Sequence, residues 1–381
     1  MPDSSSAALL PWSAVLGKCA LLSLKTTNGC NLRCAYCDVE ADPSKRAFMP
    51  PAIAKRVADV WLPCVPSSVE LMLVFHGGEP LLLSDSWYRE VVEHCQDVAH
   101  DQHRRLAFGM ATNGVLLTEK RIELFRELKI NPSVSCDGPP SLHDLGRAAG
   151  ASVENSIKLL NAAGMRCGVL LTVQPHNARH LQECMDYLSC LGCRKLLVNF
   201  LQPHGRGVNT PALPHDDMFE ACRQIFEHMA KTNCRLIEAK VSQYVGWFQH
   251  SRRNGARNRI SMDCGAAGQL FSVDWEGNIR ACDGTLDLPV LGSVVTGVET
   301  QWFREKLRSF QYKGSRFIGC FDCAAKAICK FGCPANPTAD RAFHEECEFT
   351  KEFYAYLQRN TETVDRVSAQ LLLGPDQHPT K

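Results

Sequence analysis

Three cysteines near the start of the chain, Cys30, Cys34 and Cys37, have the spacing C-x3-C-x2-C. Thiolates are the usual ligands of iron–sulfur clusters, and closely spaced cysteines let one loop hold several corners of a cubane. Three ligands on a four-iron cluster leave one iron able to bind another molecule. Structural zinc usually needs four ligands, and the next cysteine is Cys64. The spacing therefore favours an iron–sulfur cluster over zinc or over buried thiols without metal.

A second group of cysteines lies in the C-terminal third of the chain. It comprises Cys264, Cys282, Cys320, Cys323, Cys329, Cys333 and Cys347. Clustered cysteines in a chain without a secretory context are typical of metal ligands rather than of disulfides. Zinc stays open as an alternative here, because paired C-x2-C ligands suit it. The other ten of the 20 cysteines are expected to be small buried side chains.

Size and charge limit the class of protein. The chain has 381 residues and a formal net charge of +1, so its charge does not point to nucleic acid or to an anionic membrane surface. The sequence contains no apolar run long enough to span a membrane and no basic signal-peptide start. We therefore expect a cytoplasmic protein that binds neither nucleic acid nor membrane.

Short apolar runs alternate with amphipathic helical stretches between residues 20 and 235. The predicted strands are Leu21–Thr26, Glu70–Phe75, Ala107–Ala111, Pro132–Cys136, Gly168–Val173 and Lys195–Phe200. The predicted helices are Pro51–Leu62, Ser86–Ala99, Glu119–Leu128, Val153–Ala163, Ala178–Leu191 and Asp216–Lys231. This alternation predicts an α/β fold with a parallel sheet covered by helices. A hairpin with its turn at Glu276–Asn278 is predicted further on.

Polar and glycine-rich segments follow several of these strands, at the ends where parallel α/β folds collect their chemistry. They span residues 76–80, 112–114, 137–140 and 202–205. Each segment alone is compatible with an ordinary turn. Together they predict one functional site along the carboxyl edge of the sheet.

The segment 30–37 resembles the signature of the radical S-adenosylmethionine (SAM) family, C-x3-C-x-aromatic-C, with Tyr36 as the aromatic residue. The segment Gly77-Gly78-Glu79-Pro80 matches that family's motif after the second strand. The resemblance implies a partial (β/α)6 barrel and a 4Fe–4S cluster whose open iron binds SAM, which is cleaved to methionine and a 5′-deoxyadenosyl radical. The SAM-binding residues that it implies are Tyr36, Gly77, Gly78, Glu79, Thr112, Asn113, Ser135 and Asp137.

The C-terminal cysteines, with Gly277, resemble the SPASM extension of radical SAM enzymes. That resemblance implies two auxiliary 4Fe–4S clusters, and so three clusters in all. The outer one would be held by Cys320, Cys323, Cys329 and Cys347, and the inner one by Cys264, Cys282 and Cys333.

Two further positions bear on the C-terminal resemblance. The anaerobic sulfatase-maturing branch has a further inner-cluster cysteine where this chain has Leu270, which counts against a simple assignment to that branch. Asp283 stands where the same branch has its proposed base, a role that a carboxylate beside a substrate can fill. The alternative for Asp283 is a turn residue in Asp-Gly.

The resemblances also predict the organisation of the chain. The expected segments are an N-terminal extension 1–19, a radical SAM barrel 20–235, a linker and helix 236–261, a SPASM domain 262–350 and a C-terminal helix and tail 351–381. No segment of domain size precedes the barrel, so recognition of a leader peptide is expected to use the barrel rim or a separate leader-binding protein. A reductant such as flavodoxin or ferredoxin is a further expected partner.

The function that we predict is that of a radical SAM peptide maturase. Hydrogen would be removed from a ribosomally made precursor peptide, a cross-link such as a C–C cyclophane or a C–S or C–O bond would form, and the auxiliary clusters would accept an electron. The alternatives are an anaerobic sulfatase-maturing, formylglycine-forming enzyme, oxidative processing of a peptide-derived cofactor, and a non-enzymatic iron–sulfur electron carrier.

Overall fold

A computed structural model describes residues 8–254, 265–284, 288–311, 320, 322–329 and 346–373. Two of the predicted cluster ligands, Cys264 and Cys333, lie outside these described residues.

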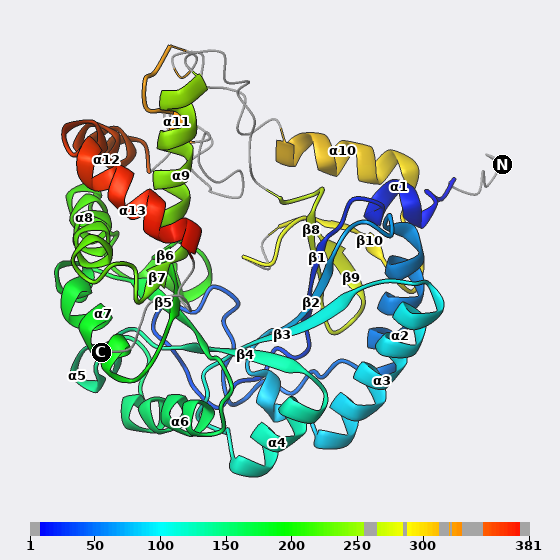
Figure 1. The fold of residues 1–381 in the computed structure, drawn as a ribbon. Coiled ribbons are helices and arrows are strands. Elements are labelled where there is room, and N and C mark those ends of the chain that lie inside the picture. The colour runs from blue at the N-terminus through cyan, green and yellow to red at the C-terminus, as the bar shows by residue number, and fades with distance from the viewer. Residues whose placement is uncertain are drawn as a thin grey trace.

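Within the described chain, ten strands form one sheet in the order β10-β9-β8-β1-β2-β3-β4-β5-β6-β7. Its parallel part comprises β1 (Leu21–Lys25), β2 (Leu71–His76), β3 (Leu106–Thr112), β4 (Ile130–Ser135), β5 (Gly168–Val173), β6 (Lys195–Phe200) and β7 (Ile237–Glu238). Each of these strands pairs in parallel with the next one along the chain. The strands curve around an open interior and the helices lie outside them (Figure 1), so the predicted α/β fold is confirmed.

The helices of the outer layer follow the predicted ones to within a few residues. They are α2 (Pro51–Trp61), α3 (Asp85–Asp101), α4 (Glu119–Glu127), α6 (Gly150–Ala162), α7 (Leu181–Cys190) and α8 (His215–Lys231). Side-chain caps fix two of their starts, because Ser84 accepts the Trp87 N–H at 3.2 Å and Thr118 accepts the Arg121 N–H at 3.3 Å. The sequence therefore sets both the identity and the beginning of these helices.

The two faces of the sheet differ in burial. On the outer face of β2, the Phe75 ring centroid lies 5.8 Å from that of Trp87 and 5.3 Å from that of Tyr88, both in α3. On the other face, Met72 of β2 is 42% exposed and Leu197 of β6 is 39% exposed. Among the described residues, the helices thus cover the outer face, and part of the inner face of the barrel is accessible.

The C-terminal part continues the same sheet. The predicted hairpin is confirmed as β8 (Leu270–Val273) and β9 (Asn278–Arg280), which pair antiparallel, and β10 (Val290–Ser293) follows. Unexpectedly, β8 also pairs in parallel with β1, so that it extends the barrel sheet. The described part of the chain has no helix both long and apolar enough to cross a membrane.

The remaining helices are short or belong to the C-terminal half. They are α1 (Trp12–Leu16), α5 (Pro140–His143), α9 (Ala239–Asn254), α10 (Thr300–Gln311), α11 (Lys326–Cys329), α12 (Cys347–Arg359) and α13 (Thr361–Leu373). The last two lie beside α8 and α9 (Figure 1), so the C-terminus returns to the barrel wall.

Candidate active site

The first cysteine loop leaves the carboxyl end of β1 and carries groups that suit iron–sulfur ligands. Cys30 and Cys34 are buried and Cys37 is partly buried. The Leu32 N–H donates to the Cys30 sulfur at 3.3 Å, and the Asn113 side-chain amide lies 3.6 Å from the same sulfur. Burial raises the pKa of the Cys30 thiol to about 12. Bound iron would supply the positive charge that a thiolate needs here, so this donor set fits a cluster.

The two glycines after β2 pack closely against this loop. The Gly78 N–H donates to the Thr27 carbonyl at 2.8 Å, and the Glu79 N–H donates to the Gly29 carbonyl at 2.9 Å. A Cβ on Gly78 would lie 1.9 Å from the Gly29 oxygen, and Gly77 has φ +126°. The sequence predicted close approach of these glycines to a ligand, whereas the contact that the structure shows is with the cysteine loop.

The Glu79 carboxylate joins three segments of the site. It is fully buried and accepts the Thr112 hydroxyl at 2.6 Å, the Asn113 N–H at 2.7 Å and the Leu81 N–H at 2.9 Å. Burial raises the pKa of Glu79, and these donors oppose that shift. Asn113 in turn donates to the Asn31 side chain at 2.8 Å. Three predicted SAM-binding residues are therefore brought together beside the first cysteine loop.

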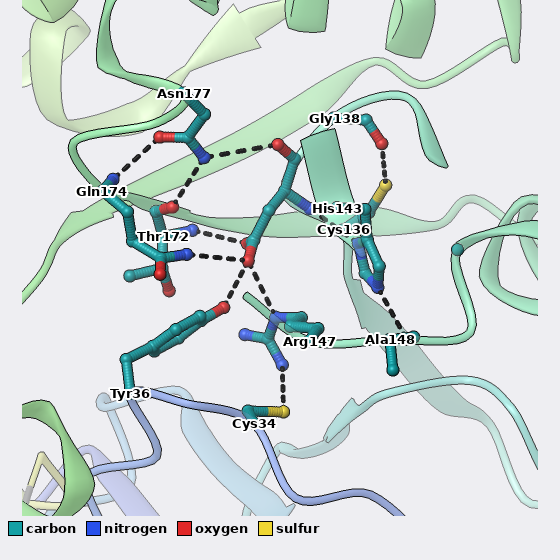
Figure 2. Close-up of polar contacts among 12 residues, drawn as sticks. Cys34, Tyr36, Cys136, Gly138, His143, Arg147, Ala148, Thr172, Gln174 and Asn177 are labelled. Carbon is teal, nitrogen blue, oxygen red and sulfur yellow. Dashed lines mark hydrogen bonds and ion pairs between the residues drawn. The ribbon is translucent and has the colours of Figure 1, made fainter. Parts of the chain in front are cut away.

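Asp137, just after β4, is the centre of a second buried network (Figure 2). One carboxylate oxygen accepts the Tyr36 hydroxyl and the Arg147 Nε–H, the latter at 3.1 Å, and the other accepts the Thr172 N–H at 2.9 Å. The Arg147 guanidinium also lies 5.1 Å from the Tyr36 ring centroid. Another Arg147 nitrogen lies 3.9 Å from the Cys34 sulfur. The aromatic residue of the cysteine motif is thereby fixed to the end of the fourth strand.

The main chain of Asp137 is held as well. Its N–H donates to Nδ1 of His143 at 3.1 Å, while Nε2 of His143 lies 3.2 Å from the Ala148 carbonyl. His143 is therefore a neutral ring with its proton on Nε2, and burial lowers its pKa. The Asn177 amide donates to the Asp137 carbonyl at 3.4 Å. Asp137 is a rigid support for the cysteine loop as much as a predicted cofactor residue.

The segment that follows β6 also contacts the first cysteine loop. Arg206 donates from Nε to the Cys34 carbonyl at 2.8 Å, from Nη2 to the Ala41 carbonyl at 2.7 Å, and from its own N–H to the Cys37 carbonyl at 3.0 Å. Gly205 has φ +51°, and a Cβ there would lie 2.5 Å from the Cys37 oxygen. The 202–205 segment was predicted to lie at the rim, but Arg206 was not singled out.

The arginines of this site carry no sequence signature. Arg147 and Arg206 are isolated basic residues, and neither stands in a spacing that indicates a cluster or a SAM site. Their positions were the only indication in the sequence that they belong to the site. Arg206 directly follows a predicted rim segment, and Arg147 comes shortly after Asp137. Ser135, a predicted SAM-binding residue, is the last residue of β4, where its Cα pairs with that of Leu170 in β5.

The C-terminal cysteines lie partly within the described residues. Cys320 and Cys347 are buried, and Cys282, Cys323 and Cys329 are partly buried. Burial raises the pKa of Cys320, and the nearby thiols of Cys347 and Cys323 raise it further. The Cys323 N–H also donates to the Cys320 carbonyl at 3.3 Å, so these two predicted outer ligands lie in one turn.

The turn after β9 carries the last predicted site residues. The Gly284 N–H lies 3.5 Å from the Cys282 sulfur, and the Asp283 carbonyl accepts the Lys25 ammonium at 2.5 Å. Leu270 starts β8, where its Cα pairs with that of Leu21. Nowhere in the described residues do three Cys, His, Asp or Glu side chains converge on one ion position. A cubane presents separate corners to its cysteines, so a cluster does not require such convergence.

Known proteins resemble this chain in sequence. The model of the radical SAM superfamily matches residues 24–188. A serine-type anaerobic sulfatase-maturating enzyme from Klebsiella aerogenes is 27% identical, over 81% of this chain and 78% of its own length. A cysteine-type anaerobic sulfatase-maturating enzyme from Clostridium perfringens is 23% identical, over 88% of this chain and 95% of its own.

A solved structure, native anSMEcpe with bound AdoMet and Cp18Cys peptide, has a TM-score of 0.75 at 20% identity. The alignment covers 92% of this chain and 99% of that one, so the likeness in fold extends beyond the barrel. The predicted resemblance and fold class are thus confirmed. The chain carries a radical SAM domain at residues 24–188 and is an enzyme that uses the radical chemistry of S-adenosylmethionine.

Proposed function

We propose that this enzyme oxidises a serine or cysteine side chain of a polypeptide substrate to the aldehyde, as a sulfatase-maturing enzyme would. The similarity to serine-type and cysteine-type relatives along most of the chain supports this more than the cross-linking function predicted first. The observation that carries the proposal is the attachment of the C-terminal hairpin to β1, because it sets the turn of Cys282 and Asp283 beside the carboxyl end of the barrel.

The proposed reaction removes two electrons and two hydrogens from the C–H and O–H or S–H groups of the substrate side chain. Serine then becomes the aldehyde directly, whereas cysteine becomes a thioaldehyde, which water converts to the aldehyde with release of hydrogen sulfide. A cluster on Cys30, Cys34 and Cys37 with bound SAM would supply the group that takes one hydrogen atom. The Asp283 carboxylate is proposed to accept the remaining proton from the substrate hydroxyl or thiol. The remaining electron would pass to the C-terminal clusters, for which Cys264, Cys282 and Cys333, and Cys320, Cys323, Cys329 and Cys347, are the proposed ligands.

The residues around the first loop would have two tasks. Glu79 and Asn113 hold the loop against β2 and β3, and Asp137 with Tyr36 holds it against β4. SAM contacts by Gly77, Gly78, Thr112 and Ser135 remain part of the proposal. An external reductant such as flavodoxin or ferredoxin would reload the first cluster.

Cross-linking of a precursor peptide is the second candidate, and Leu270 favours it. In the sheet, Leu270 pairs with Leu21 and has no atom that can ligate iron. The inner cluster would then have an iron able to take a substrate atom, which is not needed for simple oxidation. A separate leader-binding protein belongs to this second candidate.

The test uses the full chain, reconstituted anaerobically and holding about twelve irons if all three clusters are 4Fe–4S. Sulfatase-derived peptides with a central cysteine or serine are incubated with SAM and dithionite. We expect 5′-deoxyadenosine together with a peptide that reacts with an aldehyde-specific hydrazide. A peptide that loses two hydrogens but does not react would instead support a cross-link. Deoxyadenosine without any change in the peptides would refute the proposed oxidation.

The matched control is the triple variant Cys30→Ala, Cys34→Ala, Cys37→Ala. We expect it to retain about eight irons, in the C-terminal clusters, and to form no deoxyadenosine. Cleavage of SAM by this variant would show that the first cysteine loop is not the site of radical formation.

A further inference from the structure

Lys25 is an ammonium group inside the protein. It is the last residue of β1, its side chain is 0% exposed, and its Cα pairs with that of His76 at the end of β2. Burial of a charged group is unfavourable unless the group is paired and hydrogen-bonded. The group that accepts a hydrogen bond from Lys25 therefore indicates which part of the fold the ammonium stabilises.

That partner lies 258 residues away in the sequence. The Lys25 ammonium donates to the main-chain carbonyl of Asp283 at 2.5 Å. A second buried side chain holds the preceding carbonyl, because the Ser272 hydroxyl of β8 donates to the carbonyl of Cys282 at 2.7 Å. Two adjacent carbonyls of one turn are thus held by side chains from the two neighbouring strands β1 and β8.

His76, which pairs with Lys25 across β1 and β2, is a neutral ring. Its Nδ1 accepts the Gly77 N–H at 2.7 Å, which leaves the proton on Nε2. Burial lowers the pKa of His76, the charge of Lys25 lowers it further, and the carboxylates of Asp283 and Asp38 raise it. The imidazole thus belongs to the residue that pairs with Lys25, next to the glycines that contact the cysteine loop.

We propose that Lys25 is a positioning residue that fixes the turn of Cys282 and Asp283, so that the Asp283 carboxylate meets the substrate hydroxyl or thiol after hydrogen removal. Ser272 shares this task from the hairpin side. The inference rests on the proposed function, since it concerns the group that takes the substrate proton. It assigns to the end of β1 a role in the second half of the reaction, whereas the first cysteine loop serves the first half.

The main test separates radical formation from substrate oxidation. In Lys25→Met, the turn loses its charged anchor while the side chain keeps an unbranched apolar stem. We expect SAM cleavage within about twofold of wild type, whereas the aldehyde formed per deoxyadenosine falls roughly tenfold to a hundredfold, the range that a misplaced reacting group produces. We call the aldehyde formed per deoxyadenosine the coupling. If the coupling is the same in Lys25→Met and in wild type, the proposal is overturned. An equal loss of both products in a variant that holds its full iron content also overturns it.

The control is Lys195→Met, an exposed lysine at the end of β6 opposite to the site, which should leave the aldehyde formed per deoxyadenosine unchanged.

Two further measurements keep the inference testable if Lys25→Met does not load iron. Ser272→Ala removes one neutral hydrogen bond from the same turn, and we expect coupling to fall several-fold; unchanged coupling would contradict the proposal.

The second measurement needs no peptide. In the background of the triple cysteine variant, Lys25→Met should change the electron paramagnetic resonance spectrum of the reduced C-terminal clusters, because the turn carries Cys282. An unchanged spectrum overturns the inference even if wild type oxidises no peptide, whereas that lack of oxidation refutes only the proposed function.

Discussion

The two cysteine groups of this enzyme are held in different ways. The loop 29–37 is tied to the ends of β2, β3 and β4 and to the segment after β6 by groups of the protein itself, namely the buried Glu79, Asn113 and Asp137 and the half-buried Arg206. Its three cysteines lie within one short segment. The sheet therefore organises this loop, and we expect it to be largely formed before iron binds.

The C-terminal cysteines come from separate segments between residues 264 and 347. Cys347 starts α12, which is anchored where Phe349 packs on Phe200 of β6 with 5.2 Å between ring centroids. Bringing separate segments to one cluster costs loop-closure entropy, which metal binding can offset. The comparison teaches that the first cysteine loop depends on strand ends, whereas the proposed C-terminal cluster sites would depend more on the metal that they bind.

The largest expected effect comes from Gly78→Ala, which breaks the contact between β2 and the first loop. Its Cβ would lie 1.9 Å from the Gly29 carbonyl oxygen, so the loop must move. We expect iron to fall from about twelve to about eight per chain and deoxyadenosine formation to be lost, while the C-terminal clusters persist. Gly246→Ala is the matched control, because nothing lies within 4 Å of that Cβ and alanine favours a helix. Normal SAM cleavage by Gly78→Ala would show that the sheet does not organise the loop.

A smaller effect is expected from Asp137→Asn. This change tests how much the buried network around the first loop contributes to the free energy of unfolding. The change leaves the Arg147 guanidinium, 15% exposed, without its carboxylate. Loss of one partner of a buried ion pair costs about 3–5 kcal/mol in free energy of unfolding, measured by urea denaturation of the iron-free chain. Glu127→Gln is the control, since its pair with Arg89 is exposed and should contribute little. Similar losses in both variants would contradict a special role of the buried network.

The smallest expected effect is a pH dependence supplied by His143. Because burial lowers the pKa of His143 below its usual 6.5, the unfolded chain binds a proton below pH 6.5 that the folded chain does not bind. Stability is therefore full above that pH and is lost as pH falls toward the lowered pKa. His143→Asn keeps an acceptor for the Asp137 N–H but cannot be protonated. We expect a shallower acid-side fall of the melting temperature in iron-free His143→Asn, and an unchanged slope would refute this assignment.

Much of the barrel was predictable from the sequence. The strands Gly168–Val173 and Lys195–Phe200 have the predicted bounds, because apolar runs bounded by polar residues mark buried strands. The fourth strand begins at Ile130 rather than at Pro132, since a residue before proline still adopts extended backbone. Local patterns thus fixed the elements that position the first loop.

Contacts between distant segments were not predictable in the same way. The pairing of β8 with β1 joins residues about 250 positions apart and leaves no periodic pattern near either strand. From the sequence, Lys25 is an ordinary polar residue at the end of a strand. Its contact with the Asp283 turn is seen only in the structure. Arg147 and Arg206 were missed for the same reason, because a single arginine is informative only with its acceptors in place.

The pairing of β8 with β1 also has a consequence for biosynthesis. Until residues 270–273 have been made, β1 lacks one of its two neighbours and presents an open strand edge, the kind of surface that pairs with other chains. The barrel is then a sheet with its first strand uncovered and the buried Lys25 without the carbonyl that pairs with it. We therefore expect nascent chains that end before residue 270 to aggregate, because both edges of β1 are paired only once the hairpin has been made.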